Sequence, residues 1–254
     1  MSKKYFFFDI DGTLLRPNER IPTKLTTDCL NQLRENGHFV AIATGRPYHM
    51  ALDCAKEIGI NNFVCEGGHC FCIDYEIIET KSMDRLKCIE LCLRAEELGA
   101  KLIVMPNQYD YYSKSEGLAE QYYRNAFKVQ IDKDLDYNKI KEFYRISIIL
   151  DVTKKQELPH IEELGYLEHP FGFTVEPTVK EKGIEKIVNY LNGDLKEVVV
   201  FGDGSNDLSM FKAAPFSIAM GNSIDELKEI ADFVTKSNEE EGIPFACQHF
   251  GWID

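Results

Sequence analysis

The sequence lacks long hydrophobic runs and is poor in positive charge. No apolar stretch approaches the roughly 18 residues that a membrane-spanning helix needs. Lys3 and Lys4 precede only residues 5–8 before Asp9 ends the apolar run, so we expect no secretory signal. The 29 basic and 42 acidic side chains give a formal net charge of -13. This balance argues against a nucleic-acid backbone or an anionic membrane as the main partner.

Disulfides are also not expected. Eight cysteines in a chain of 254 residues without an export signal indicate free thiols in the cytoplasm. The spacing of Cys65, Cys70 and Cys72 matches no common zinc pattern, and the last two alternate with Phe71 and Ile73 on an expected strand. We therefore interpret these three cysteines as small buried or half-buried side chains, and leave open whether they have a metal or redox role.

Apolar strands alternate with amphipathic helices at both ends of the chain. This alternation predicts a parallel sheet with helices on both faces, in a Rossmann-like α/β core. The expected strands are residues 4–10, 38–43, 62–65, 197–201, 216–219 and 233–234. The expected helices are residues 23–36, 48–58, 184–191, 207–213 and 223–231.

The middle of the chain follows a different pattern, in which hairpins mix with helices. This mixture predicts an inserted α+β domain with an antiparallel sheet. Its expected strands are residues 101–105, 108–113, 145–151 and 171–176, and its expected helices are residues 84–98, 115–126 and 154–164. We place the core domain at residues 1–81 and 179–254, and the inserted domain at residues 82–178.

Two aspartates directly follow the first expected strand. The apolar residues 6–8 run into Asp9, Ile10, Asp11 and Gly12. Like charges about 4 Å apart repel by roughly 4 kcal/mol at an effective dielectric constant of about 20, so a cation should lie beside them. Magnesium, which prefers oxygen ligands, is the simplest candidate.

Polar groups also follow other elements of the expected core. Thr44 and Gly45 follow the strand at 38–43, and the acidic loop 202–207 follows the strand at 197–201. Lys182 and Gly183 lie at the start of the helix that leads into that strand. In open α/β sheets, ligands bind beyond the carboxyl ends of the strands. A carboxylate nucleophile, a hydroxyl beside a backbone N–H, a lysine and a second acidic loop suit phosphoryl transfer.

These motifs, taken in order, resemble those of the haloacid dehalogenase (HAD) superfamily. They are Asp-Ile-Asp-Gly-Thr-Leu (9–14), Ala-Thr-Gly-Arg (43–46), Lys-Gly (182–183) and Gly-Asp-Gly-Ser-Asn-Asp (202–207). The resemblance covers essentially the whole chain and is to the Cof-type phosphatases, whose cap is of type two, subclass B. The segment between Leu14 and Thr23 is too short for a cap, and the insert follows the third strand, as that subfamily requires. The resemblance implies a phosphoric monoester hydrolase with bound Mg2+, an aspartyl-phosphate intermediate, and an insert that acts as a mobile, substrate-selecting lid.

The roles of the family's residues carry over to the matching positions. Asp9 would be the nucleophile, and Asp11 would act first as general acid and then as general base. The metal would be held by the Asp9 carboxylate, the Asp11 backbone carbonyl and Asp203, with Asp207 in support. The phosphoryl oxygens would be held by Ile10 and Gly45 backbone N–H groups, the Thr44 hydroxyl, Lys182 and Asn206.

The sequence leaves structural alternatives open for each of these groups. Asp9 and Asp11 could be turn and cap residues, the loop 203–207 an ordinary turn, and Lys182 a solvated side chain. Thr44 and Asn206 could be helix caps. A phosphotransferase or phosphomutase would use the same intermediate, and a non-catalytic regulator that binds a phosphometabolite would keep the same binding groups.

Substrate preference depends in part on Glu66, which stands where the family usually has asparagine. A carboxylate there disfavours an anionic substrate group and accepts hydrogen bonds from sugar hydroxyls, unless Glu66 points into solvent. The family-level expectation is a small phosphorylated metabolite: a sugar phosphate, pyridoxal phosphate or flavin mononucleotide (FMN). We expect a cytoplasmic monomer or homodimer that binds neither nucleic acid nor membrane.

Overall fold

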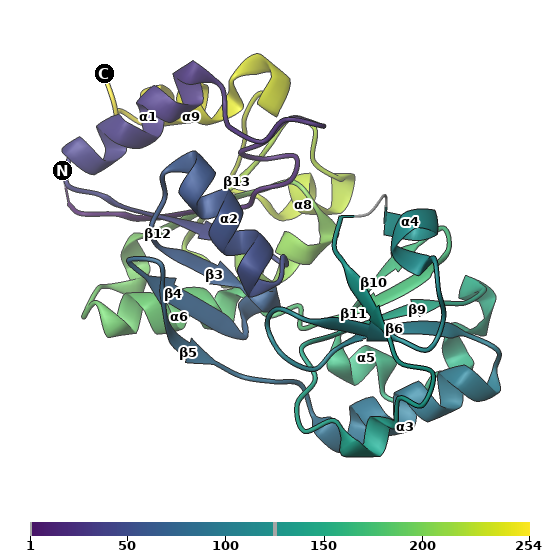
Figure 1. Ribbon diagram of the computed structural model, residues 1–254. Coiled ribbons are helices and arrows are strands. Elements are labelled where there is room, and N and C mark those ends of the chain that lie inside the picture. Colours follow the sequence, from purple (N-terminus) through teal and green to yellow (C-terminus); the bar gives the residue numbers. More distant parts are fainter. Residues whose placement is uncertain (1, 124–125) are drawn as a thin grey trace. The chain divides into compact units, whose positions relative to one another are not determined.

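The structure is a computed structural model that describes residues 2–123 and 126–254, and the chain divides into two units (Figure 1). The first unit comprises Met1–Arg46, Met50–Thr80 and Thr178–Asp254, and the second comprises Pro47–His49 and Lys81–Pro177. The sequence predicted one domain boundary after residue 81 and a second after residue 178. Residue 1 of the expected core domain and residues 124–125 of the expected helix 115–126 lie outside the described residues.

The first unit is built on an eight-stranded sheet in the order β14-β13-β12-β1-β2-β3-β4-β5. From β14 to β3 all neighbouring strands are parallel, and β4 and β5 add an antiparallel hairpin at one edge. The predicted α/β fold with a parallel sheet is therefore confirmed. The strands are β1 (Tyr5–Phe8), β2 (Phe39–Ala43), β3 (Phe63–Cys65), β4 (Cys70–Ile73), β5 (Glu76–Thr80), β12 (Val198–Gly202), β13 (Phe216–Ala219) and β14 (Phe233–Val234).

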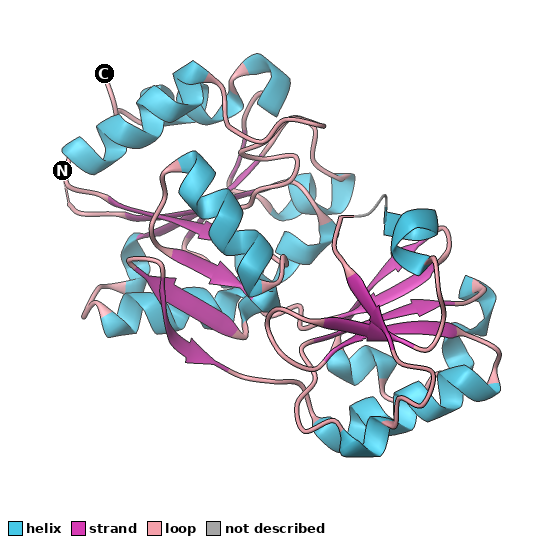
Figure 2. Ribbon diagram, in the orientation of Figure 1, coloured by secondary structure: helices cyan, strands magenta, loops and turns pink. Residues whose placement is uncertain are grey.

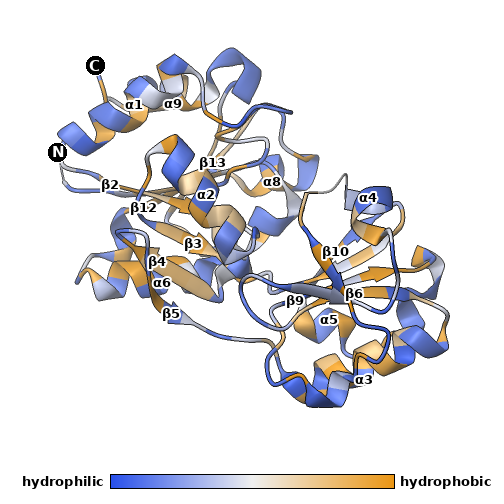
Figure 3. Cartoon of the chain, in the orientation of Figure 1, coloured by the Kyte–Doolittle hydropathy of each residue, from blue (hydrophilic) through white to orange (hydrophobic). Residues whose placement is uncertain are grey.

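Helices cover both faces of this sheet, which explains why its central strands are apolar without alternation. One face packs on α6 (Lys180–Tyr190), α7 (Leu208–Ala213) and α8 (Asp225–Ile230), and Phe7 and Val200 belong to this core. The other face packs on α1 (Lys24–Glu35), with α9 (Gly242–His249) beside it. There Phe6 meets Trp252 edge to face, with ring centroids 4.9 Å apart. Residue hydropathy shows the same division, with apolar strands inside and polar helix surfaces outside (Figure 3).

Helix α2 (Tyr48–Ile58) follows β2 after a short loop, as the sequence predicted. The N-terminus of α1 is capped by Thr23, whose side chain accepts the backbone N–H of Thr26. Parallel neighbours place the ends of β1, β2, β3 and β12 at a common edge of the sheet.

The second unit contains a six-stranded sheet in the order β10-β11-β9-β6-β7-β8 (Figure 2). It is antiparallel except between β7 and β8, so the predicted α+β insert with an antiparallel sheet is also found. The strands are β6 (Lys101–Met105), β7 (Tyr111–Ser113), β8 (Val129–Ile131), β9 (Arg145–Ile149), β10 (Tyr166–His169) and β11 (Gly172–Val175). The helices are α3 (Arg85–Glu97), α4 (Leu118–Tyr123) and α5 (Ile161–Leu164).

Three local predictions differ from the structure. The helix expected at 154–164 is instead the 3-10 turn Val152–Glu157 followed by α5, because Pro159 cannot continue a helix and His160 has a φ of 60°. Helix α6 begins four residues earlier than expected, at Lys180. The strands β5, β8 and β10 and the helix α9 were not predicted. In the described part of the chain, no helix is both long and apolar enough to cross a membrane.

Candidate active site

Three carboxylates converge at the edge of the sheet where β1 and β12 end. Asp9 follows β1, while Asp203 and Asp207 lie in the loop after β12. One carboxylate oxygen from each lies within 4.8 Å of the others. Asp9 and Asp207 are buried, with 4% and 0% of their surfaces exposed. Because buried carboxylates repel one another strongly, this arrangement requires cations.

The side chain of Lys180 supplies one positive charge in this cluster. Its Nζ atom lies 2.5 Å from Oδ1 of Asp9 and 2.6 Å from Oδ1 of Asp207, and the residue is 1% exposed. Burial alone would lower the pKa of Lys180, but the charges of Asp207 and Asp9 outweigh it and raise the pKa. Burial raises the pKa of Asp9 above its ordinary value, and the charge of Lys180 opposes that shift.

The structure corrects the predicted lysine, because Lys182 does not reach the carboxylates. Its Nζ lies 3.6 Å from the Glu185 carboxylate and its side chain is 61% exposed. At 3.6 residues per turn, positions 180 and 182 are about 200° apart around α6 and face opposite ways. Lys180 was missed because the helix was expected to begin later, at residue 184. A usable signal was Gly183, which is three residues after Lys180 and therefore on the same helix face.

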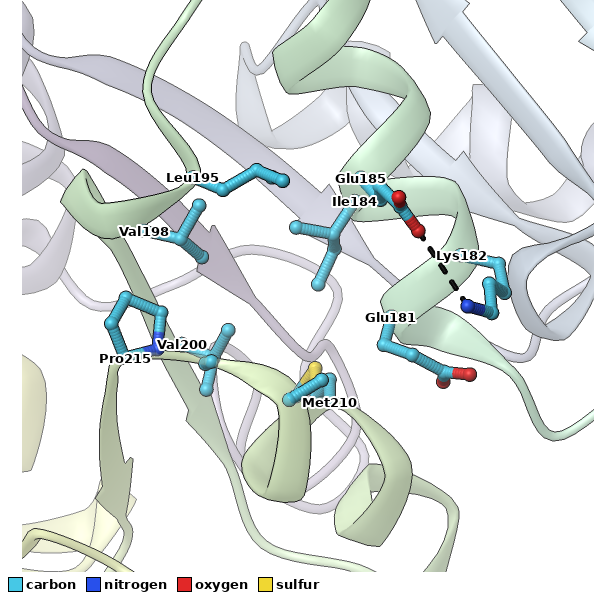
Figure 4. Close-up of a pocket in the computed structure, with 11 residues that line it drawn as sticks. Glu181, Lys182, Ile184, Glu185, Leu195, Val198, Val200, Met210 and Pro215 are labelled. Carbon is cyan, nitrogen blue, oxygen red and sulfur yellow. Dashed lines mark ion pairs between the residues drawn. The ribbon is translucent and has the colours of Figure 1, made fainter.

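Figure 4 shows where Lys182 lies instead. Its side chain points toward Glu185 at the margin of a cavity of about 140 Å³ between α6, β12 and α7. Val198, Val200 and Met210 make this cavity largely apolar, and its lining contains none of the three converging aspartates. The cavity therefore lacks the aspartate nucleophile and the carboxylate metal ligands that the predicted phosphoryl transfer needs.

Hydrogen bonds hold the acidic loop after β12 in place. Oδ2 of Asp207 accepts the backbone N–H groups of Asp203 and Gly204 at 2.9 and 3.0 Å. Oδ1 of Asp203 accepts the hydroxyl of Thr13, a buried residue that the sequence analysis did not select, at 2.8 Å. Burial raises the pKa of Asp203 to about 6, although the Thr13 hydrogen bond acts in the opposite direction.

Gly12 allows the two acidic segments to approach each other. Its φ is +87°, and a Cβ atom there would overlap the Asp203 carboxylate. Any other residue would therefore displace the Asp203 carboxylate from its present position, in addition to straining its own backbone.

Asp11 does not share in the carboxylate cluster. Its two oxygens accept hydrogen bonds from Arg46, at 2.9 Å from Nε and 2.6 Å from a terminal nitrogen. The Asp11 side chain is 67% exposed and that of Arg46 is 25% exposed. The bidentate pair fixes the orientation of the Asp11 carboxylate beside the buried aspartates.

The remaining predicted phosphate ligands lie on the loops at the same edge. Thr44 and Gly45 follow β2 and are buried, and the Thr44 hydroxyl accepts the backbone N–H of Arg46 at 3.1 Å. This bond makes Thr44 a local turn residue and leaves its hydroxyl hydrogen available to another acceptor. Ile10 is buried directly after Asp9, and Asn206 lies in the 3-10 turn Ser205–Asp207.

Glu66 is buried, at 4% exposure, and so does not point into solvent. It begins the 3-10 turn Glu66–Gly68, and its backbone N–H donates to the carbonyl of Arg46 at 2.9 Å. The same turn touches α6, because the carbonyl of Gly67 accepts the N–H of Val179 at 2.8 Å, one residue before Lys180. This turn therefore links the β3 loop to the lysine of the cluster.

The carboxylate cluster is suited to a divalent cation. Three ionised aspartates and one ammonium group sum to a formal charge of -2. Carboxylate oxygens are the ligands that magnesium prefers, and a charge of +2 would balance the cluster. The residues present therefore fit Mg2+, with Asp9 and Asp203 as its carboxylate ligands and Asp207 in support.

Comparison with known proteins agrees with this geometry. The family model described as haloacid dehalogenase-like hydrolase matches residues 6–246. "Putative phosphatase YkrA" of Bacillus subtilis is 29% identical, with all of both chains covered. "5-amino-6-(5-phospho-D-ribitylamino)uracil phosphatase YitU" of the same organism is 24% identical, covering 92% of this chain and 93% of that protein. The solved structure of "HAD Subclass IIB Sugar Phosphatase BT4131" is 25% identical and has a TM-score of 0.82, with 99% of this chain and 100% of that chain covered. The chain belongs to the haloacid dehalogenase-like hydrolase family and is one of its phosphatases.

Proposed function

We propose that this phosphatase hydrolyses the phosphate monoesters of small metabolites, sugar phosphates first, through a phosphorylated Asp9 with Mg2+ bound. The observation that carries the proposal is the cluster of buried Asp9, Lys180 and Asp207 with half-buried Asp203. When bound, the metal would neutralise charge on the phosphoryl oxygens and favour the ionised form of Asp9, as Lys180 does. A sugar phosphate is preferred over pyridoxal phosphate and FMN because the related subclass IIB enzyme is named a sugar phosphatase.

The first half of the reaction would form a bond between Asp9 and phosphorus. One Asp9 oxygen attacks the phosphorus atom, and the bond between phosphorus and the ester oxygen breaks. Asp11 donates a proton to the departing oxygen, so the leaving group departs as an alcohol. The ion pair with Arg46 holds Asp11 in its ionised form, which is the form that the second half of the reaction needs. To act as the acid, Asp11 would first release Arg46 and take up a proton from water.

The second half would hydrolyse the acyl phosphate. Asp11, now ionised, accepts a proton from water, and the water oxygen attacks phosphorus. The bond from Asp9 to phosphorus breaks, which restores the Asp9 carboxylate and releases inorganic phosphate. Throughout, the Thr44 hydroxyl, the N–H groups of Ile10 and Gly45, and Asn206 would hold phosphoryl oxygens. Lys180 takes the place that the sequence analysis gave to Lys182.

The second unit would act as the cap that selects the leaving group, as predicted for residues 82–178. Polar residues gather on one side of its sheet: Ser147 and Thr174 are buried neighbours in register on β9 and β11, and His169 lies 2.7 Å from the Thr174 hydroxyl. The Arg145–Glu176 ion pair joins the first residue of β9 to the residue that follows β11, on the same side of the sheet. Such donors and acceptors suit the hydroxyl groups of a sugar.

The test is phosphate release from a panel of phosphorylated metabolites and para-nitrophenyl phosphate, with and without Mg2+. We expect magnesium-dependent release without an added acceptor, and none above background from Asp9→Asn. Borohydride reduction of protein quenched during turnover should convert the phosphorylated Asp9 to homoserine, which mass spectrometry locates. Turnover that requires an acceptor would identify a phosphotransferase or mutase, and wild-type turnover equal to that of Asp9→Asn would favour a non-catalytic regulator.

The metal assignment has its own test in Asp203→Ala. Removing this carboxylate should raise the magnesium concentration needed for half-maximal activity by tenfold or more, because one of few oxygen ligands is lost. His169→Ala is the matched control in the second unit: it should change the ranking of substrates and leave the magnesium titration unchanged. An unchanged titration for Asp203→Ala would remove that residue from the ligand set.

A cytoplasmic location and a monomeric or homodimeric state remain predictions. All eight cysteines lie in the described part of the chain as buried free thiols, which suits a reducing compartment.

A further inference from the structure

Three thiols converge in the first unit, on the hairpin formed by β3 and β4. Cys65 ends β3 and lies opposite Cys70 on β4, and Cys72 is two residues further along β4. Their sulfur atoms lie within 4.8 Å of one another, and the three residues are 0% to 1% exposed. Sequence spacing did not reveal this cluster, because the strand pairing, and not a short chelating loop, brings the thiols together.

The strand register fixes the three thiols on one side of the sheet. Val64 and Phe71, which alternate with them, pack into the core that contains α6. Residues at i and i+2 on a strand share a face, so Cys70 and Cys72 lie together on the opposite face, with Cys65 across from Cys70. The backbone ladder therefore holds the sulfur atoms in place before any ligand binds.

The spacing is close to that of a thiolate metal site. Metal–sulfur bonds of about 2.3 Å at tetrahedral angles place sulfur atoms about 3.8 Å apart. The thiols need a contraction of no more than about 1 Å to reach that geometry. Soft thiolates select ions with filled d shells, such as Zn2+ and Cu+, over Mg2+, so this site differs in ligand chemistry from the carboxylate cluster.

The thiols also interact with one another. Hydrogen bonds from Cys65 and Cys70 lower the pKa of Cys72, whereas burial and the charge of Glu66 oppose that shift. Burial and its thiol neighbours raise the pKa of Cys65.

Charge favours a divalent ion at this position. Three thiolates with a divalent ion carry a net charge of -1, and with a monovalent ion -2. Burying the smaller charge costs less, and the buried carboxylate of Glu66 makes additional negative charge near Cys72 still less favourable.

We propose that Cys65, Cys70 and Cys72 form a binding site for a thiophilic divalent metal ion of the Zn2+ class. On binding, each thiol releases its proton to water and its sulfur lone pair coordinates the metal, with no change of oxidation state. On the outer side of β4, the sheet continues only with the edge strand β5. Local opening of this edge strand therefore gives the ion a route to the thiols. The three thiols are different residues from the three aspartates of the carboxylate cluster.

To test the site, the protein is first reduced and stripped of metal. Excess Mg2+ is then added so that the carboxylate cluster is filled before any thiophilic ion is titrated. Cd2+, a spectroscopic substitute for Zn2+, should produce a thiolate-to-metal charge-transfer band that saturates at one ion per chain. Zn2+ should abolish the band, bind in competition with a chromophoric chelator, release protons, and raise the melting temperature. Cys65→Ser, Cys70→Ser and Cys72→Ser should each weaken Zn2+ binding at least tenfold.

The control variant is Cys88→Ser/Cys92→Ser, which removes two buried thiols of α3 in the second unit and should leave the band and the affinity unchanged. The proposal is overturned if wild-type protein gives no charge-transfer band, or if the control variant loses it as fully as the three single variants. Anaerobic titration with Cu+ forms a second arm. Tighter competition by Cu+ than by Zn2+ would overturn the divalent assignment.

Discussion

Replacing Lys180 by methionine tests whether this lysine balances the buried carboxylates. The substitution keeps an unbranched side chain that is one atom shorter, but removes the charge that lies 2.5 Å from Asp9 and 2.6 Å from Asp207. At 4.8 Å and an effective dielectric constant of about 20, two carboxylates repel by roughly 3.5 kcal/mol. Breaking a buried ion pair by removing one partner costs about 3–5 kcal/mol, which is the same range.

We therefore expect Lys180→Met to lower the free energy of unfolding by about 3–5 kcal/mol in the absence of metal. For a folded unit of this size the loss corresponds to a fall in melting temperature of about 6–20 °C. The matched control is Lys182→Met, two residues away and exposed, which should change stability by no more than about 0.5 kcal/mol. Both are measured by thermal unfolding in a chelating buffer at neutral pH.

Two further measurements separate charge imbalance from simple loss of packing. Burial raises the pKa of Asp9 to about 8 in the wild type, although Lys180 lowers it, so in the variant this carboxyl group binds a proton at a higher pH than in the wild type. The stability deficit of the variant should therefore shrink as the pH falls toward about 8. The double variant Lys180→Met/Asp207→Asn should be more stable than Lys180→Met alone, because one uncompensated carboxylate is gone. If Lys180→Met and Lys182→Met melt within about 2 °C of each other, the reasoning is refuted.

Four other substitutions have defined outcomes. Asp9→Asn should abolish turnover while the metal-free melting temperature stays the same or rises, since it removes one of the converging charges; a large fall would show that the aspartate is structural. Gly68→Ala should lower the free energy of unfolding, measured by chemical denaturation, by several kcal/mol, because its φ is +109° and a Cβ would overlap the Val179 carbonyl. Gly99→Ala is the control: its φ is +84° but its Cβ would lie in open space, so the loss should be only about 1 kcal/mol. Burial lowers the pKa of His38, so the contribution of neutral His38 to stability is present above about pH 6.5 and is lost as the pH falls through its lower folded-state pKa. His38→Asn should flatten that part of the plot of melting temperature against pH. An unchanged slope would contradict this assignment.

The sequence predicted the core strands well because burial on both faces leaves no polar positions in them. Phe6, Phe7 and Phe8 are 0% exposed, and no competing helical pattern fits so short an apolar run. The edge strand β5 (Glu76–Thr80) was missed for the opposite reason. It is mostly exposed and carries two glutamates, so its pairing with β4 is determined by the hairpin and not by hydrophobic pattern.

The convergence of the aspartates could be predicted from the order of the strands. To predict which lysine joins them, the first residue of α6 had to be known. Parallel strands whose ends share an edge bring Asp9 and Asp203 together even when strand limits shift by one or two residues. On a helix, by contrast, an error of two residues turns a side chain by about 200°. The bidentate contact between Asp11 and Arg46 depends on side-chain geometry across 35 positions of the chain and has no local signal.

Glycines explain how Lys180 reaches the carboxylates at all. A Cβ on Gly183 would overlap Val64 of β3, so this glycine lets the first turn of α6 lie directly on the sheet. Gly68 allows the same closeness at the carbonyl of Val179, on the turn that follows Cys65. Lys180 lies one residue after that carbonyl and one helical turn before Gly183, so both contacts fix the direction of its side chain. In the Lys-Gly pair of residues 182–183, the glycine therefore indicates the position of the site. The lysine that it positions is Lys180, about one helical turn earlier.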